Sequence, residues 1–156
     1  MPQSLARVII HMTFSTKDRV RALAYPELIA QLNAYTAGIL HNLGCPAIQV
    51  GAVIDHMHLL YLQSRTVALS DVVAVVKKET SAWIKGQMPD LKDPYLVKFA
   101  WQNGYAAFSV SESNMDVVKT YIMNQESHHH RVTFQEEYRK FLEKHGVSFD
   151  ERYVWE

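Results

Sequence analysis

The side chains with the clearest chemical potential in this sequence are two histidines separated by one apolar residue, His56 and His58. They lie in the apolar run 54–62, which is typical of a β-strand. Side chains alternate between the faces of a strand, so both imidazoles point to the same side, about 7 Å apart at Cα. Asp55 points to the other side unless a turn or bulge intervenes, and is a poor third ligand. The spacing fits a metal site and a purely structural histidine pair equally well.

Tyr121 and Gln125 form a second pair, far downstream. Their spacing is i and i+4, so on a helix they share one face. Tyrosines on amphipathic helices usually belong to the core or its rim, but Tyr121 lies outside the apolar stripe, on a polar flank with Gln125 and His128. A phenol, with an ordinary pKa near 10, requires help to act as a nucleophile. A nearby divalent ion would stabilise the phenolate and neutralise charge on a phosphate, which suggests phosphoryl transfer with DNA as the substrate.

The ligands in this hypothesis are His56, His58 and Gln125. Neutral ligands leave the ion its full positive charge, and a mixed nitrogen and oxygen set accepts Mg²⁺ or Mn²⁺, with Mn²⁺ better suited to imidazole. Three further histidines follow at 128–130. Successive residues on a helix diverge by about 100°, so at most His128 could assist at this site.

Composition limits the class of protein. The chain has 156 residues, 48% of them hydrophobic and 21% charged, which predicts one soluble globular domain over 1–156. No stretch approaches the roughly 20 apolar residues of a membrane span, and the start does not resemble a signal peptide. One cysteine, Cys45, fits a reducing compartment. We therefore expect a cytoplasmic protein that has no membrane partner.

Net charge is zero, which argues against a protein that coats duplex DNA without specificity. Local basic positions remain, and Lys17, Arg19 and Lys77 are candidate phosphate contacts, although such residues are more often a solvated face. Trp101 and Tyr105 could stack on unpaired bases. Structural packing is at least as good an explanation for these two rings.

The order of predicted elements indicates an α+β protein. Strands are expected at 5–15, 47–54, 56–63 and 105–110. Helices are expected from Pro26 to Gly44, from Ser70 or Asp71 to about Lys85, from Asn114 to about His129, and from a Thr133 cap to Lys144, with a loop at 86–94. This is the ferredoxin-like split βαβ pattern: an antiparallel sheet with helices on one face, plus C-terminal helices that carry the proposed nucleophile.

Several motifs, taken together and in order, resemble the single-tyrosine HUH transposases of the insertion sequence 200 type, the IS200-like transposase family. They cover essentially the whole chain: His11 with 15–17 (STK), 56–58 (HMH), 101–105 (WQNGY), 108–111 (FSVS), 121–125 (YIMNQ) and 150–153 (DERY). Each motif alone is weak, and their combination is specific.

The resemblance implies a metal-dependent enzyme that cleaves and rejoins single-stranded DNA at the ends of an insertion sequence. His56, His58 and Gln125 would hold the ion, and Tyr121 would attack a phosphodiester to leave a 5′-phosphotyrosine and a free 3′-OH. Members of the family bind DNA hairpins near the element's ends and are homodimers. There the tyrosine helix of one subunit can dock on the histidine pair of the other, so we expect a homodimer with composite active sites.

Other functions stay open from the sequence. A non-catalytic or host-recruited protein of the same fold could bind single-stranded hairpins, although binding alone would not require Tyr121 beside three metal ligands. A replication-type HUH nickase is a further alternative, but such enzymes are usually larger. A fourth possibility is a metal hydrolase that uses bound water, but that mechanism gives Tyr121 no chemical role.

Overall fold

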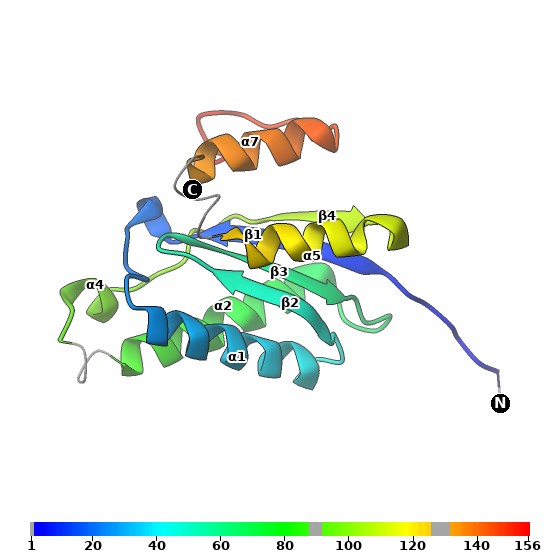
Figure 1. Cartoon of the computed structure of the whole chain (residues 1–156), viewed down its shortest axis with the longest axis horizontal. Helices are drawn as coiled ribbons and strands as arrows, with labels where there is room; N and C mark the ends of the chain where they lie inside the picture. The colour runs from blue at the N-terminus through cyan, green and yellow to red at the C-terminus, as the bar shows by residue number, and fades with distance from the viewer. Residues whose placement is uncertain (1, 88–91, 126–131) are drawn as a thin grey trace.

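A four-stranded antiparallel sheet forms the centre of the molecule (Figure 1). A computed structural model describes residues 2–87, 92–125 and 132–156. The strands are β1 (Ile9–Ser15), β2 (Ala47–Ala52), β3 (His56–Leu62) and β4 (Ala106–Val110), in the order β2-β3-β1-β4. Helix α1 (Pro26–Asn42) connects β1 to β2, and α2 (Leu69–Gly86) lies between β3 and β4 in the chain. This connectivity confirms the predicted ferredoxin-like α+β fold.

The two faces of the sheet have different covers (Figure 1). Helices α1 and α2 pack on one face, where the larger apolar core lies, including Met12, Phe14, Met57 and Leu59. The C-terminal helices α5 (Met115–Met123) and α7 (Phe134–Lys144) lie over the other face. Alternation along the strands therefore buries both sets of side chains, and His56 and His58 point toward α5 and α7.

Strand β1 is shorter than the sequence suggested, because 5–8 lie outside it. Ile9 pairs with Leu62 of β3 and Val110 of β4, and both neighbouring strands end there. Residues 2–8 are exposed. The Val8 carbonyl oxygen still accepts a hydrogen bond from the Gln63 N–H, but no paired strand continues beyond Ile9 on either side, so the apolar pattern of Leu5 to Val8 is not enough to extend the strand.

Two helix boundaries also differ from expectation. Helix α2 begins at Leu69, after Ala68, and neither Ser70 nor Asp71 is its N-cap. Helix α5 ends at Met123, since Asn124 leaves the helical region at φ −97°, ψ 17°. Asparagine is a poor residue for a helix interior, which is consistent with an end at this position. Of the helix expected to continue to His129, residues 126–129, including His128, lie outside the described residues.

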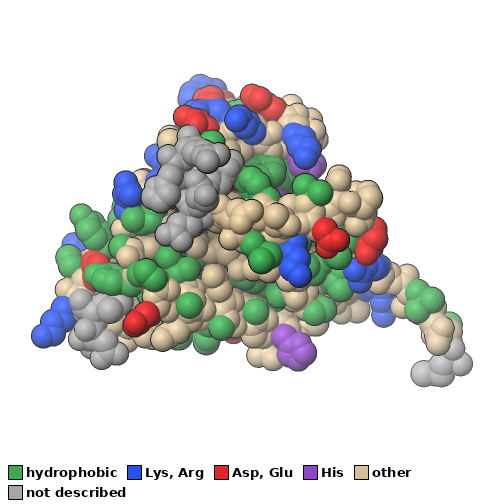
Figure 2. Space-filling model, viewed as in Figure 1, with side chains coloured by type: hydrophobic (Ala, Val, Ile, Leu, Met, Phe, Trp, Pro, Cys, Tyr) green, Lys and Arg blue, Asp and Glu red, His purple; other side chains and the backbone are tan. Residues whose placement is uncertain are grey.

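Helix α7 follows the sequence prediction closely. Thr133 is its N-cap, and the Thr133 Oγ1 accepts a hydrogen bond of 3.2 Å from the Glu136 backbone N–H. Gly146 follows with φ +66°, the left-handed conformation that favours glycine after a helix. Figure 2 shows acidic and basic side chains side by side over this end of the molecule. None of the described helices combines the length and the apolar character needed to cross a bilayer.

Candidate active site

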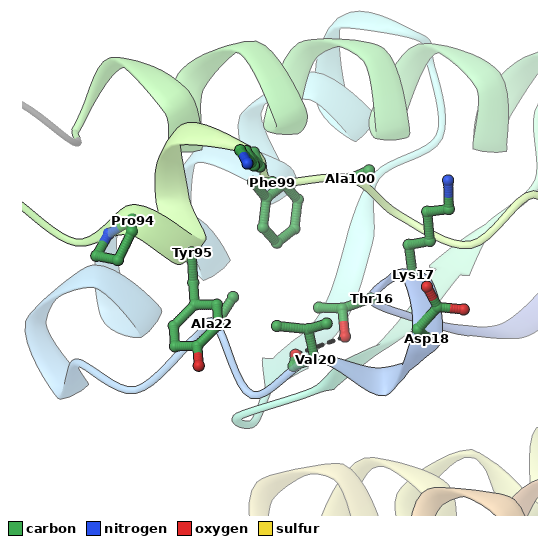
Figure 3. A pocket seen from close by; sticks show the side chains of 10 residues that line it. Thr16, Lys17, Asp18, Val20, Ala22, Pro94, Tyr95, Phe99 and Ala100 are labelled. Atoms are coloured by element: carbon green, nitrogen blue, oxygen red, sulfur yellow. Dashed lines mark hydrogen bonds between the residues drawn. The ribbon is translucent and has the colours of Figure 1, made fainter.

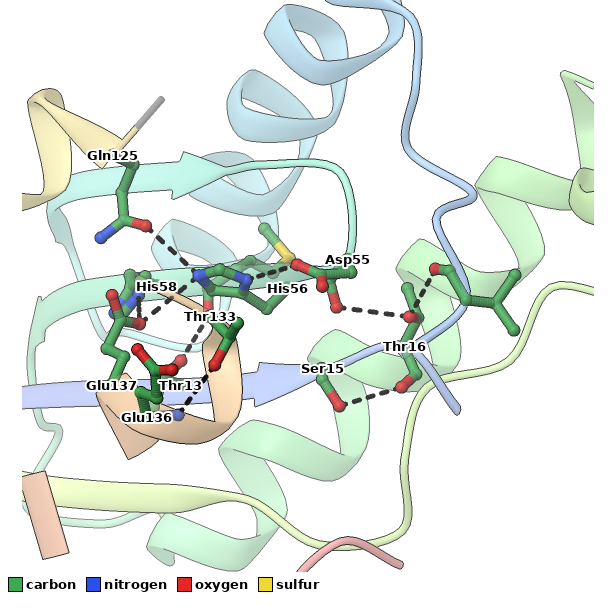
Figure 4. A network of polar contacts seen from close by, with 12 residues as sticks. Thr13, Ser15, Thr16, Asp55, His56, His58, Gln125, Thr133, Glu136 and Glu137 are labelled. Carbon is green, nitrogen blue, oxygen red and sulfur yellow. Dashed lines mark hydrogen bonds and ion pairs between the residues drawn. The ribbon is translucent and has the colours of Figure 1, made fainter. Parts of the chain in front are cut away.

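A buried group of two imidazoles and one carboxylate lies between the sheet and α7 (Figure 4). The Nε2 atom of His58 is 2.7 Å from Oε1 of Glu137, and the Nε2 atom of His56 is 3.4 Å from the same oxygen. All three residues are at most 4% exposed. One ligand atom from each lies within 4.8 Å of the others, so the group has the composition and the dimensions of a metal site.

Glu137 is the important residue that the sequence analysis missed. It occupies the apolar face of α7, between Phe134 and Phe141, and this face packs on the sheet. A charged residue in the buried stripe of an amphipathic helix is unusual, because an unpaired buried carboxylate is costly. That anomaly was readable in the sequence, and it was the available signal for Glu137.

Each histidine has a second partner that turns its Nε2 toward Glu137. Nδ1 of His56 is 2.7 Å from Oδ1 of Asp55, and Nδ1 of His58 is 2.7 Å from Nε2 of His11. Asp55 is in the turn before β3, where its backbone oxygen accepts a hydrogen bond from the Thr16 N–H. The turn thus brings Asp55 to the imidazole ring, a contact that a regular strand would not allow. Partners of this kind fix the tautomer and orientation of metal-binding histidines.

Tyr121 and Gln125 also reach this group. The Tyr121 hydroxyl donates a short hydrogen bond to Oε2 of Glu137, and its ring centroid is 5.8 Å from that of His58. Oε1 of Gln125 is 3.3 Å from Nε2 of His56. The Gln125 Nε2 atom is buried and has no hydrogen-bond partner among the described residues. The four residues selected from sequence therefore come together within one chain, although Gln125 follows α5 instead of lying inside it.

The ionisation of each residue in this group depends on the charges of its neighbours. Burial alone would lower the pKa of His56, but hydrogen bonds and charge from Asp55 and Glu137 outweigh it and raise the pKa to about 9. Burial opposes ionisation of Glu137 as well, yet the adjacent imidazoles hold the pKa of its carboxyl well below the ordinary value. Burial and the Glu137 carboxylate raise the pKa of Tyr121 above its usual range. Among the protein groups alone, the phenol is therefore held in its protonated form.

The candidate DNA contacts fall into two groups. Lys77 Nζ lies 2.8 Å from the carbonyl oxygens of Gln102 and Gly104, and Trp101 is 7% exposed with its Nε1 donating to Thr80. Both residues thus connect the segment before β4 to α2. For Trp101 this is the structural packing that the sequence left open as the alternative to base stacking. Tyr105 is half-buried, and the centroid of its ring is 5.9 Å from Lys77 Nζ.

Lys17 and Arg19 belong to the short 3-10 helix η1 (Lys17–Arg19). The Lys17 side chain is exposed and borders a hollow of about 450 Å³ between η1 and the short helix α4 (Pro94–Val97), shown in Figure 3. Arg19 is half-buried, with its guanidinium 5.8 Å from the Trp155 ring. Lys17 is thus the most accessible of the predicted phosphate contacts.

Gly51 allows α5 to approach the sheet beside the site. It pairs with His58 across β2 and β3, and a Cβ built on it would lie 2.7 Å from Cγ2 of Ile122, next to Tyr121. We expect Gly51→Ala to displace α5 and lower the free energy of unfolding by about 1–3 kcal/mol. Chemical denaturation would measure the loss.

Gly38 supplies the matched control for this substitution. It is exposed within α1, and a Cβ there meets nothing within 4 Å. Gly38→Ala should stabilise the protein by about 0.5–1 kcal/mol, since glycine is the more flexible residue in a helix. Equal effects of the two substitutions would contradict the close approach of α5.

Comparisons with known proteins are consistent with this geometry. A family model described as "Transposase IS200 like" matches residues 4–125. A candidate transposase from Deinococcus radiodurans R1 has a similar structure, with a TM-score of 0.62 at 23% identity over 80% of this chain and 95% of its own. A REP-associated tyrosine transposase bound to a REP hairpin gives 0.55 at 12% identity over 96% and 91%. At these identities the two structures support the fold alone, and a search of curated proteins finds no significant match.

Proposed function

Because the chain belongs to the IS200-like transposase family, whose members cleave DNA and transfer strands, we propose that it is a metal-dependent transposase acting on single-stranded DNA. Tyr121 is the proposed nucleophile, and 1–156 acts as one catalytic domain in the bacterial cytoplasm, at the nucleoid. One observation carries this proposal: the Tyr121 hydroxyl and the Nε2 atoms of His56 and His58 converge on a single buried carboxylate. A core that needed only packing would not gather these groups.

The residues present fit a divalent ion. Both imidazoles present Nε2 to the same point, and the side-chain amide of Gln125 is buried beside them, with its Oε1 atom 3.3 Å from Nε2 of His56. His56, His58 and Gln125 are the proposed ligands, with Mg²⁺ or Mn²⁺ as the ion. When bound, the ion would lower the energy of the Tyr121 phenolate and of the negative charge that develops on the phosphate.

The proposed reaction replaces one phosphoester bond by another. The Tyr121 oxygen attacks phosphorus and forms a 5′-phosphotyrosine, the bond to the 3′ oxygen breaks, and the proton lost by the phenol balances the one gained by the 3′-OH. Attack by the 3′-OH of another strand on the phosphotyrosine reverses the step. The bond energy stays in the protein–DNA link, so strands are rejoined without ATP.

The proposed substrate is single-stranded DNA with hairpins at the ends of the element. The REP-associated relative, which was determined with a hairpin bound, supports this choice. The exposed Lys17 is a proposed phosphate contact. Arg19, Lys77, Trp101 and Tyr105 remain proposed DNA contacts, but their side chains are less accessible. A homodimer remains part of the proposal. The position of Tyr121 beside the histidines of its own chain favours cleavage in cis over a composite site.

The decisive experiment is covalent capture. The protein is incubated with Mn²⁺ and single-stranded hairpin oligonucleotides labelled at the 3′ end, and the products are separated on a denaturing gel. We expect label to move with the protein, since the 5′-phosphate of the downstream fragment is the linked end. Label that moves with the protein only when it is placed at the 5′ end would refute the assigned polarity. A complex that dissociates fully in denaturant would favour a binding module.

Metal binding should depend on pH through His56. Its pKa is raised to about 9, so at neutral pH the ion must displace a proton from the ring. Mn²⁺ affinity should therefore rise by up to about tenfold per pH unit between about 6.5 and 9, with release of about one proton near pH 7.5. Without added metal, the stability contributed by charged His56 is complete below about pH 6.5 and is lost as the pH rises through 9.

Calorimetric titration in two buffers of different ionisation enthalpy would measure the proton release. Asp55→Asn removes a carboxylate that raises the pKa of His56, so this variant should release a smaller fraction of a proton at pH 7.5. An Mn²⁺ affinity that is the same at pH 6.5 and pH 9 would contradict this account.

A further inference from the structure

Glu137 has no role in the chemistry proposed so far, yet it lies at the centre of the site. We infer that Glu137 is an additional protein ligand of the ion and, through its second oxygen, the residue that positions Tyr121 beside it. This inference rests on the proposed function and deepens it by adding α7 to the catalytic machinery. It makes the metal site a two-histidine, one-carboxylate group to which Gln125 adds an amide.

The first argument comes from the placement of the carboxylate. Glu137 is 4% exposed, on a helix face otherwise formed by aromatic and aliphatic side chains. Burying a carboxylate is unfavourable unless positive charge and hydrogen bonds compensate for it. The compensation comes from His56 and His58, which lie opposite it on β3. A divalent ion among the same three residues would compensate this charge more completely.

The second argument comes from the different contacts of the two Glu137 carboxylate oxygens. Oε1 faces both Nε2 atoms, and Oε2 accepts the hydrogen bond from the Tyr121 hydroxyl. An ionised carboxylate has enough lone pairs to bind a cation with one oxygen and accept a phenolic hydrogen bond with the other. Glu137 can therefore fix the distance between nucleophile and ion.

The third argument concerns the helix that carries Glu137. Thr133 caps α7, and Phe134, Tyr138 and Leu142 pack it on β4. A ligand on such a helix is held by packing on both sides, which is how proteins pre-organise a site. The same contacts keep Phe141 against the Tyr121 ring, at 5.7 Å between centroids. Helix α7 thus orients the nucleophile in two ways.

Metal affinity provides a test that is independent of DNA cleavage. Mn²⁺ is titrated into the full-length protein and into Glu137→Gln, and free Mn²⁺ is followed by electron paramagnetic resonance. Loss of a ligand should weaken binding by at least about 10- to 100-fold, the cost usual for partners of a metal site. The matched control is Glu136→Gln, which removes the same charge from the exposed neighbour and should leave the affinity unchanged.

Unchanged or tighter Mn²⁺ binding by the Glu137→Gln variant would contradict the inference. If Glu137→Gln binds Mn²⁺ as tightly as the natural protein, or more tightly, the carboxylate competes with the ion instead of binding it, and the inference is overturned. Circular dichroism would establish that the variant is folded. Should it fail to fold, Glu137→Asp keeps the charge but shortens the side chain, and the inference then requires Mn²⁺ to raise its melting temperature less than that of the natural protein.

The positioning role has its own readout. At saturating Mn²⁺, Glu137→Gln should form the covalent DNA adduct at least about tenfold more slowly, because the phenol is no longer held by a carboxylate. An unchanged adduct rate would overturn this role while leaving the proposed transposase intact. Conversely, a natural protein that binds Mn²⁺ through Glu137 but forms no adduct would refute the proposed function and leave the ligand assignment standing.

Discussion

Tyr121→Phe is expected to abolish both DNA cleavage and covalent attachment, while hairpin binding is retained. The substitution removes the only atom that can form the phosphotyrosine bond in the proposed reaction. It also removes one hydrogen bond to the buried Glu137 carboxylate, so we expect a stability loss of about 1–3 kcal/mol. Denaturing gels would measure the adduct, and a mobility shift under native conditions would measure binding.

Tyr35→Phe is the control for this substitution. Tyr35 is an exposed tyrosine of α1, stacked on Trp83 on the opposite face of the sheet. Its replacement should leave adduct formation unchanged. If Tyr121→Phe still yields an adduct that survives denaturant, a different residue is the nucleophile and the assignment fails.

Loss of the metal site should have the second large effect. Without the ion, burial and the adjacent Glu137 carboxylate raise the pKa of Tyr121 and oppose formation of the phenolate. An ion contributes several kcal/mol to a phosphoryl transfer, so a chelator should slow cleavage by about a thousandfold or more. Added Mn²⁺ or Mg²⁺ should restore it. Cleavage rates on a labelled single strand, with and without chelator, would measure the change.

His58→Ala should reproduce the effect of the chelator, and excess Mn²⁺ should not rescue it. The control is His41→Ala, since His41 is an exposed histidine in the last turn of α1. This control should cleave at the normal rate. Full activity of His58→Ala in the presence of chelator would show that the buried histidines have a structural role only.

The sequence by itself determined the architecture and most of the candidate site. Period-two alternation in β3 placed His56 and His58 on one face, and the apolar and capping patterns located all the main helices. These features are local, because they depend on residues a few positions apart. For the same reason, the predicted ranges of strand β1 and helix α5 were too long. The start of β1 depends on whether paired strands continue beside it, and the end of α5 lies at an asparagine. The apolar pattern indicates neither.

Only the tertiary structure revealed what surrounds those residues. Glu137 is 79 positions from His58 along the chain, and His11 is 47 positions from it, so no spacing rule connects them. The fold directs the ammonium group of Lys77, a candidate DNA contact, to backbone carbonyls in the segment before β4, which no local pattern around Lys77 indicates. The ionisation of a buried group depends on which charges folding brings beside it. The sequence therefore specified which residues could do chemistry, and the packing of α5 and α7 on the sheet decided how those residues are charged and held.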